Sequence, residues 1–427
     1  MVEGMRRERV VIVGGGFSGL ACARKLDRRP VDVLLLDERV YHLFTPLLYE
    51  VASALLNPSD ISYPFRACFR RSPNVRFRQA HVTSVDLDRR TISTGADGEL
   101  HYDYLVLATG STNNYFGNQE LANFSIGMKT LEEALRLRNH VLTCLERASQ
   151  TQDELDRRRW LTFLIVGGGP TGVEYTGALL ELLKLVLGRD FPNLSRGQSR
   201  VILVEGQDRL LPTFAEGLSR YTERTLRRRC AEVRTATLVE KATDESAVLS
   251  TGDLIQTRTI VWSAGVRPSD IEAHGVPRSA SKQIEVDDQL RLSGREDVFV
   301  IGDLASVHHG GEKLPMLAPV AVQEGRYVAR AIVDRMKASP SARKRFRYVD
   351  KGTMATIGRN AAVGHIGRLR FRGLVGWLAW LVVHLYYLVG FRNRLVVLAS
   401  WTWNYVRKDR PLRIVVRAQE DRIADDS

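Results

Sequence analysis

The sequence Val10-Val-Ile-Val-Gly-Gly-Gly-Phe-Ser-Gly19 decides the fold expected for this chain of 427 residues. Its β-branched start is typical of a buried parallel strand, and residues 20–26 after it have a helical pattern. A second apolar run, 31–36, ends at Asp37, where a carboxylate can hold both hydroxyls of a ribose. The spacing of three glycines fits a dinucleotide-binding turn, in which they allow the tight turn, the approach of a pyrophosphate and close helix–strand packing: Gly14, Gly16 and Gly19.

The same pattern recurs later in the chain. An apolar run, 161–166, leads into Gly167-Gly-Gly-Pro-Thr-Gly172 and a helix, and the next strand, 201–204, ends in Glu205. One such motif could be an ordinary glycine-rich turn, but two complete copies predict two dinucleotide sites. The carboxylate of Glu205 would repel a 2′-phosphate, so we expect NADH to be preferred over NADPH, with Arg209 nearby as the residue that could weaken this preference.

Two dinucleotide sites in one chain suggest two cofactors that meet. One would be tightly but non-covalently bound FAD, because Asp37 requires an adenosine ribose, and the other a diffusible NADH that supplies hydride. The expected fold class is α/β, with two Rossmann-like dinucleotide-binding domains plus a C-terminal amphipathic membrane-docking helical region. We predict a discontinuous FAD domain over 1–118 and 275–340, an NADH domain over 119–274, and a membrane-anchoring region over 341–427.

The positive charge of the chain is concentrated near its C-terminus. The net charge is +13, yet residues 343–417 hold 16 Lys and Arg against two acidic residues, while residues 1–342 hold 45 against 43. The basic tail also contains four tryptophans, which is unlike the basic stripe of a folded nucleic-acid-binding domain. We therefore expect no nucleic-acid partner. The tryptophans are Trp377, Trp380, Trp401 and Trp403.

The four cysteines lie far apart and form neither a C-x-x-C pair nor a metal-type pattern with histidine. This favours a reducing compartment, predicts no metal site, and argues against a thiol relay to the flavin such as that of disulfide reductases or sulfide:quinone oxidoreductases. The short charged start, 1–9, leaves no room for a signal peptide. The cysteines are Cys22, which we expect to be a core residue, and Cys68, Cys144 and Cys230.

From about residue 8 to about residue 415 the sequence resembles the type II NADH dehydrogenases, within the flavoproteins that have two dinucleotide-binding domains. Beyond the two glycine turns, the matching pieces are Tyr41–Ala52, Leu105–Gly110, Trp262–Arg267, Val300–Ala305, Ala321–Tyr327 and Leu385–Arg394, the last being the most specific to these enzymes.

The resemblance implies two sets of cofactor-binding residues. Asp303 would bind the ribityl chain of FAD, although it could instead cap the helix that follows. The segment around Pro46 would lie along the isoalloxazine, or could be surface hydrophobic cover. The FAD set is Gly14, Gly16, Phe17, Ser18, Gly19, Asp37, Glu38, Pro46, Val82, Ala108, Thr109, Gly110, Asp303 and Ala321. The NADH set is Gly167, Gly169, Pro170, Thr171, Gly172, Glu174, Glu205, Ala264 and Gly265.

Two residues are candidates for catalysis. Glu174 follows the second glycine turn, where an acid is favoured by the helix dipole alone, and the resemblance implies a role in hydride or proton handling near the nicotinamide. Gln323 lies in a segment similar to the family's quinone pocket, which often carries two glutamines. Pro319 stands in place of the first glutamine here, so the native quinone is left open.

Residues 373–391 form a run of 19 residues without formal charge, flanked on both sides by arginines. The run is long enough for a transmembrane candidate, but its tryptophans and tyrosines occur along its whole length, His384 is central, and both flanks are basic. We therefore favour a helix docked on an anionic lipid surface, through residues 368–413, over a membrane span or a buried helix in the core or a homodimer.

These features together predict a peripheral, monotopic enzyme on the cytoplasmic face of the cell membrane. It would pass electrons from NADH through FAD to a membrane quinone without pumping protons, and so feed a respiratory chain. The alternatives are a soluble NADH oxidase or diaphorase, and a non-catalytic flavin redox sensor docked on membranes.

Overall fold

The computed structural model describes residues 7–95, 98–273, 276–339, 344–407 and 412–415. The chain forms two compact units, the first from residues 1–43, 62–112 and 266–351 and the second from residues 44–61, 113–265 and 352–427. The predicted division instead assigned 44–61 to the first domain and made 341–427 a region of its own. The difference arises because both segments pack against helices of the second unit.

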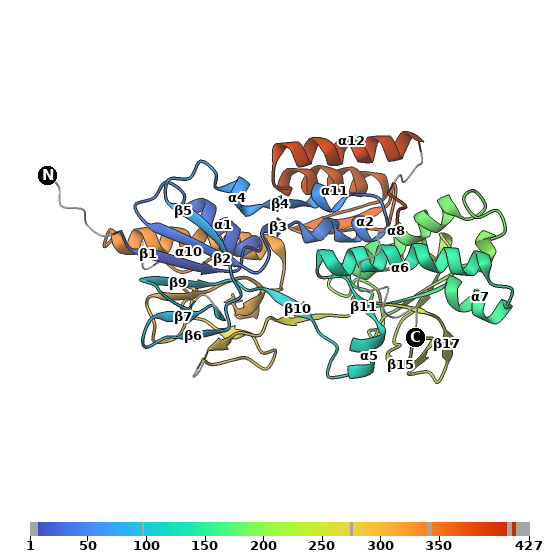
Figure 1. Cartoon of the computed structure of the whole chain (residues 1–427), viewed down its shortest axis with the longest axis horizontal. Coiled ribbons are helices and arrows are strands. Elements are labelled where there is room, and N and C mark those ends of the chain that lie inside the picture. Colours follow the sequence, from blue (N-terminus) through green and yellow to red (C-terminus); the bar gives the residue numbers. More distant parts are fainter. Residues whose placement is uncertain (1–6, 96–97, 274–275, 340–343, 408–411, 416–427) are drawn as a thin grey trace. The chain divides into compact units, whose positions relative to one another are not determined.

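A five-stranded parallel sheet forms the centre of the first unit (Figure 1). Its middle strand begins with a charged residue and is then fully apolar and buried, which is why it lies between two neighbours on each side. Val10 pairs with Val33 on one side and with Tyr104 on the other. The strand order is β22 (Val298–Val300), β9 (Tyr104–Leu107), β1 (Arg9–Val13), β2 (Asp32–Asp37) and β5 (Val75–Gln79).

Two helices of the first unit, α1 (Phe17–Leu26) and α10 (Ala318–Met336), pack closely on one another. Gly325 permits this contact, because a Cβ there would lie 2.1 Å from the carbonyl oxygen of Ser18. The smaller elements are β3 (Tyr41–Leu43), β4 (Ser62–Pro64), α4 (Phe65–Cys68), β6 (Ser84–Asp86), β7 (Thr91–Ser93), β8 (Glu99–His101), β19 (Val266–Pro268), β20 (Glu272–Ala273), β21 (Ile284–Glu285), η4 (Gly302–Leu304), β23 (Ala305–Ser306), β24 (His308–His309) and β25 (Glu312–Lys313).

The second unit contains a parallel sheet of the same construction. Leu164 pairs with Ile202 and with Ile260, so the strand before the second glycine turn is again central. The two sheets differ in the origin of one edge strand. In the second sheet this strand, 126–127, precedes the central strand in the chain, whereas the corresponding strand of the first sheet, 298–300, follows it. The order is β11 (Ile126–Gly127), β18 (Thr259–Trp262), β12 (Thr162–Val166), β13 (Arg200–Val204) and β14 (Ala231–Arg234).

Helices surround this second sheet. The long helix α6 begins with a capping box, in which Thr130 accepts the amide of Glu133 and Glu133 accepts the amide of Thr130. The remaining elements up to residue 261 are η1 (Thr45–Leu47), α2 (Leu48–Ala52), α3 (Pro58–Ile61), β10 (Ser111–Asn113), α5 (Gln119–Phe124), α6 (Leu131–Gln150), α7 (Glu154–Leu161), α8 (Pro170–Val186), η3 (Arg196–Gln198), α9 (Glu216–Arg228), β15 (Val239–Ala242), β16 (Ser246–Leu249) and β17 (Leu254–Gln256).

The C-terminal part of the second unit is a three-stranded antiparallel sheet followed by two helices. The sheet consists of β26 (Thr353–Thr356), β27 (Ala362–Ile366) and β28 (Leu369–Arg372), and the helices α11 (Gly373–Tyr387) and α12 (Phe391–Arg407) contact one another (Figure 1). The predicted α/β class with two Rossmann-like sheets and a helical C-terminal region is therefore confirmed.

The sequence predicted one helix over the apolar run 373–391. The structure does not form a single helix there. The run is broken between Tyr387 and Phe391, where Gly390 adopts a positive φ of 91°. In the described part of the chain, no helix combines the length and apolar character needed to cross a membrane.

Candidate active site

We call a glycine closed where a Cβ atom would clash with a neighbouring atom, and open where a Cβ atom would meet nothing. The first glycine turn has two closed glycines and one open glycine. Gly14 has a φ of +102°, and a Cβ on it would lie 2.3 Å from the carbonyl oxygen of Ala108. A Cβ on Gly19 would lie 1.8 Å from the oxygen of Gly14, whereas a Cβ on Gly16 would meet no atom within 4 Å. The backbone is therefore accessible only at Gly16, at the start of α1, where a pyrophosphate can approach it.

Asp37 closes the other end of this turn. Its Oδ2 accepts a hydrogen bond from the amide of Gly15 at 2.6 Å, and its Oδ1 accepts one from the amide of Arg39 at 2.8 Å. The neighbouring Glu38 is exposed and pairs with His81. Val82 lines a surface pocket of about 480 Å³ in the same unit.

Two residues at the start of α1 have buried neighbours. The ring of Phe17 meets that of His42 edge to face, with centroids 5.2 Å apart. His42 Nδ1 lies 3.0 Å from the carbonyl oxygen of Gly15, and burial lowers the pKa of His42 to about 4, so that the ring is neutral and donates this bond near neutral pH. Ser18 is buried, and its hydroxyl lies close to Gly302.

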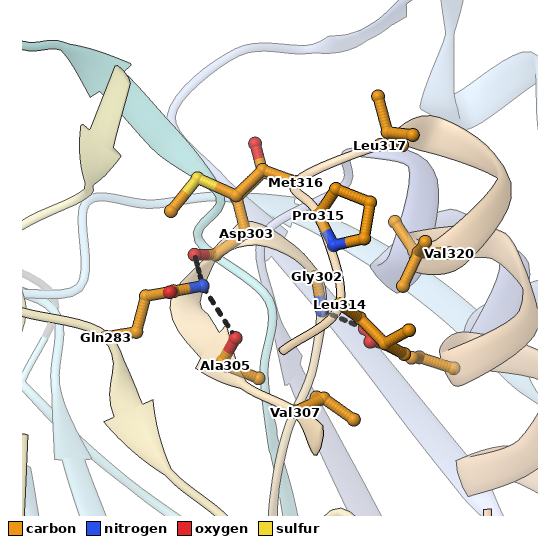
Figure 2. A pocket seen from close by; sticks show the side chains of 12 residues that line it. Gln283, Gly302, Asp303, Ala305, Val307, Leu314, Pro315, Met316, Leu317 and Val320 are labelled. Atoms are coloured by element: carbon orange, nitrogen blue, oxygen red, sulfur yellow. Dashed lines mark hydrogen bonds between the residues drawn. The ribbon is translucent and has the colours of Figure 1, made fainter. Parts of the chain in front are cut away.

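A small pocket surrounds the Gly302–Asp303 turn (Figure 2). Gln283, which is 2% exposed, donates its amide to the carbonyl oxygens of Asp303 at 3.1 Å and Ala305 at 2.7 Å. Glu324 accepts the amide of Gly302 at 2.5 Å, and burial raises the pKa of Glu324 to about 8. The predicted residue Ala321 lines the same pocket.

These residues fit a bound dinucleotide. The carboxylate of Asp303 accepts a hydrogen bond from Ser111 and is therefore held in place within the turn. The hydroxyl of Thr109 is buried and has no hydrogen-bond partner among the residues that the structure describes. The hydroxyl of Thr109 and the open backbone at Gly16, where α1 begins, are therefore the groups available to bind a ligand.

Gln323 lies in the first unit with its amide group engaged. It donates to the carbonyl oxygens of Pro319 at 3.1 Å and Val349 at 3.0 Å, and it accepts the amide of Val349 at 3.1 Å. The side chain thus joins the start of α10 to the segment before residue 350. Its predicted role in catalysis remains a proposal.

The second glycine turn repeats the geometry of the first. Gly167 has a φ of +108°, and its Cβ would lie 2.6 Å from the oxygen of Ser263, while a Cβ on Gly172 would lie 1.9 Å from the oxygen of Gly167. Gly169 is open, as Gly16 is. Pro170 occupies the first turn of α8, where its missing N–H is no loss, and Thr171 follows it, exposed.

The acidic residue beside the second glycine turn, Glu205, corresponds to Asp37 beside the first. Glu205 accepts the amides of Gly168 at 2.6 Å and Gln207 at 2.8 Å, as Asp37 does in the first unit. Ala264 and Gly265 follow β18, and the carbonyl of Gly265 accepts the amide of Asn114 at 3.1 Å. Arg209, which could weaken the cofactor preference, donates to the carbonyl of Pro212 at 3.0 Å.

Glu174 is buried on α8 in the second unit. Burial raises the pKa of Glu174 from its usual 4.5 to about 8; the amide of Thr356, at 3.3 Å, opposes the rise, Glu50 adds to it, and Trp380 opposes it. Glu174 therefore holds a proton for a large fraction of the time near neutral pH. Pro46, the one FAD candidate in this unit, lies in η1.

Sequence reasoning missed several buried polar residues near these positions. Glu324 stands beside Gln323 and could have been noticed as a charged residue on the inner face of a helix. Gln283 and Glu50 carry no such signal, because a partner of each comes from a distant part of the chain; for Glu50 one such partner is Trp401, 351 positions away.

The C-terminal helices expose an apolar surface, which we call the docking face. Its exposed apolar residues are Leu374, Val375, Leu378, Val382, Tyr386, Phe391, Leu395, Leu398, Trp403, Tyr405 and Val406. Exposed arginines adjoin it at Arg368, Arg370, Arg372, Arg392, Arg394 and Arg407. Part of the predicted lipid-binding stretch, residues 408–411, lies outside the described residues, as do residues 1–6 of the chain start and 416–427.

All four cysteines are free thiols. Cys22 and Cys144 are buried, and burial raises the thiol pKa of both, to about 12 for Cys144. Groups of three or more His, Cys, Asp or Glu able to hold a metal ion are absent from the described part of the chain.

Comparison with known proteins agrees with the geometry. Residues 8–325 match the family model of the pyridine nucleotide-disulphide oxidoreductases, and residues 351–407 match the NDH2 C-terminal domain. The type II NADH:quinone oxidoreductase NdhA of Mycobacterium tuberculosis is 37% identical over 95% of this chain and 88% of its own length, and Ndh of the same organism is 36% identical over 95% and 89%.

A solved structure of NDH2 from Plasmodium falciparum in complex with NADH shares the fold. Its TM-score is 0.88 at 19% identity, over 96% of this chain and all of the other. The fold and the paired turns define an oxidoreductase with two dinucleotide-binding sheets. Within that class, the chain belongs to the type II NADH dehydrogenases, also named type II NADH:quinone oxidoreductases.

Proposed function

We propose that this enzyme oxidises NADH through bound FAD and reduces a membrane quinone to quinol without pumping protons. The observation that carries the proposal is the pair of glycine turns, each closed at its first and third glycine and open at its second. FAD, when bound, would accept two electrons with a hydride from NADH and pass the electrons on to the quinone. The names of the relatives, type II NADH:quinone oxidoreductases, support the choice of both substrates.

The residues of the first unit would hold FAD. The open start of α1 would receive the pyrophosphate, Asp37 the adenosine ribose, and Asp303 the ribityl chain. In the second unit the start of α8 would receive the pyrophosphate of NADH, and Glu205 its ribose hydroxyls. Glu174 would hold a proton on its carboxyl group.

We also propose that the docking face lies on an anionic membrane surface, on the cytoplasmic side of the cell membrane. Apolar side chains of α11 and α12 would enter the lipid interface while the adjoining arginines meet negative head groups, each contributing about 1 kcal/mol. A quinone could then arrive from the bilayer and NADH from water.

The redox part is tested with the purified flavin-containing protein. NADH should bleach the flavin absorption, and a ubiquinone or menaquinone analogue should restore it with one quinol formed per NADH consumed. If NADH leaves the flavin oxidised, the proposal is wrong. If oxygen or dyes restore the absorption and quinones do not, the protein is an oxidase or diaphorase.

The membrane part is tested by sedimentation with vesicles of anionic and of neutral lipid. Leu378→Glu combined with Val382→Glu should reduce the bound fraction on anionic vesicles at least tenfold, because both side chains are exposed on the docking face. The matched control is Leu155→Glu with Leu254→Glu, two exposed leucines elsewhere in the second unit. Equal losses in both variants would contradict docking through α11.

A further inference from the structure

A second buried carboxyl group, that of Glu50, lies in the same part of the second unit as Glu174. Glu50 is on α2 and 3% exposed. The hydroxyl of Tyr49 donates to its Oε1 at 3.0 Å, and the indole N–H of Trp401 donates to its Oε2 at 2.7 Å. Each oxygen of this carboxyl group therefore accepts a hydrogen bond, an arrangement that stabilises the ionised form.

The environment of Glu174 stabilises a negative charge less well, although Trp380 and a backbone amide both favour the ionised form. Its helix, α8, packs directly against α2, and its Oε1 accepts the amide of Thr356 over a longer distance, 3.3 Å. Burial disfavours its negative charge, and the charge of Glu50 disfavours it further. Two neighbouring buried carboxyl groups in unlike surroundings divide a proton unequally between them.

We propose that Glu50 and Glu174 form a proton-holding pair in which Glu50 carries the negative charge and Glu174 carries the proton. Trp401 of α12 is the positioning residue that fixes this division through its hydrogen bond to Glu50. The pair thereby connects a helix of the docking face to the residue that holds the proton.

The place of this pair in the reaction rests on the proposed function. Oxidation of NADH by a quinone takes up one proton from water, while NADH supplies the two electrons and the other hydrogen. The O–H bond of Glu174 would break as an O–H bond of the quinol forms, and Glu174 would then regain a proton from water. The charge on Glu50 keeps Glu174 able to take that proton back near neutral pH.

Apart from Arg138, which stays positively charged, the other titratable groups named here are uncharged or paired near neutral pH. Burial and the two carboxyl groups raise the pKa of Tyr49 well above its usual 10. On α11, burial lowers the pKa of His384 to about 4, and its ring stacks on Trp380 with centroids 4.0 Å apart. On α8, Glu181 is bonded to Arg229 at 2.9 Å. On α6, which also packs on α2, burial lowers the pKa of Arg138.

The test is an infrared titration of the flavin-loaded full-length protein, in which protonated carboxyl groups give a resolved stretching band. We expect Glu174→Gln to remove a band that is present at neutral pH and titrates near pH 8. Glu324 titrates in the same range, so the band of Glu174 is identified by its loss in this variant alone.

Two further variants should move the midpoint of that band in opposite directions. Glu50→Gln removes the neighbouring negative charge and should lower the midpoint by roughly one pH unit. Trp401→Phe keeps the ring but removes the donor that stabilises ionised Glu50, so the pair should bind its proton more tightly and the midpoint should rise. Trp403→Phe, two residues away on the exposed side of α12, should leave it unchanged.

A merely structural role for Trp401 would lower stability without raising this midpoint. Ultraviolet resonance Raman spectra of the indole N–H give a second readout, since Glu50→Gln should weaken the hydrogen bond of Trp401. The proposal is overturned if Glu174→Gln removes no band, or if Trp401→Phe leaves the midpoint unchanged or lowers it. Because neither readout needs NADH or quinone, such a result would leave the proposed function unaffected. If the spectra are as expected but the protein does not reduce quinone, the proposed function is wrong and the proton-holding pair stands.

Discussion

The two glycine turns, one in each unit, are built alike, yet the buried carboxyl groups in the two units differ. Both turns have a positive φ at the first glycine, a closed third glycine and an open second glycine. Glu324 in the first unit and Glu174 in the second both have a pKa raised by burial to about 8. Glu324 accepts a backbone amide at 2.5 Å, whereas Glu174 accepts one at 3.3 Å and has Glu50 as a neighbour.

This comparison shows that local sequence sets the turns, while distant segments set the chemistry beside them. Each turn needs only a strand, three glycines and the start of a helix. Glu324 is held by a turn 22 residues away, and Glu174 by an amide 182 residues away. A tight bond to the backbone suits a carboxyl group that supports a loop, and a loose one suits a group that exchanges a proton.

The largest expected effect comes from the closed glycines. Gly19→Ala and Gly172→Ala should each destabilise their unit by about 3 kcal/mol, because the new Cβ would lie within 2 Å of a carbonyl oxygen. Chemical unfolding measures the loss, with Gly217→Ala at an exposed position of α9 as the control, since its Cβ meets no atom within 4 Å. Equal stability of all three variants would show that the turns are looser than their geometry indicates.

The open glycines should separate the two ligands. At Gly16 and Gly169 an alanine fits the backbone conformation, so the fold should be as stable as before or more stable by up to about 1 kcal/mol. Gly16→Ala should weaken FAD retention tenfold or more, and Gly169→Ala should raise the KM for NADH similarly while FAD stays bound. If Gly169→Ala releases FAD, the assignment of ligands to turns is wrong.

Asp37 and Glu205, the acidic residues at the ends of β2 and β13, should affect different cofactors. Glu205→Gln removes the repulsion of a 2′-phosphate, so the preference for NADH over NADPH in kcat/KM should fall about tenfold. Asp37→Asn should weaken FAD retention without changing this preference. An unchanged ratio in Glu205→Gln, with Glu240→Gln as a surface control, would remove Glu205 from cofactor selection.

Over a single pH unit, the smallest expected effect is on the pH dependence of stability. A carboxyl group whose pKa is raised from 4.5 to about 8 stabilises the fold fully below the lower value, and this contribution is lost as the pH rises toward 8. Glu174→Gln and Glu324→Gln should each remove up to about 1.4 kcal/mol per pH unit from the slope in this range. Unfolding curves across this range measure it, and unaltered slopes would mean that neither group is protonated in the folded protein.

The sequence alone was sufficient for the central strand of each sheet, the glycine turn that follows it and the next strand. In 10–19 and in 161–172, the apolar run, the glycine spacing and the following helix lie within a few residues of one another, so short-range sterics define the motif. The acids Asp37 and Glu205 could be predicted for the same reason, because each ends the next strand. The open face at Gly16 and Gly169 follows from these same local constraints.

Only the tertiary structure decided what surrounds these turns. It grouped residues 44–61 and the described part of 352–427 with the second unit, ended the helix of the apolar run 373–391 at Tyr387, and engaged the amide of Gln323 with Val349. It also brought Trp401 to Glu50 across 351 positions. Burial and hydrogen bonding of a carboxyl group depend on which distant segments pack over it, and no local pattern in the sequence carries that information.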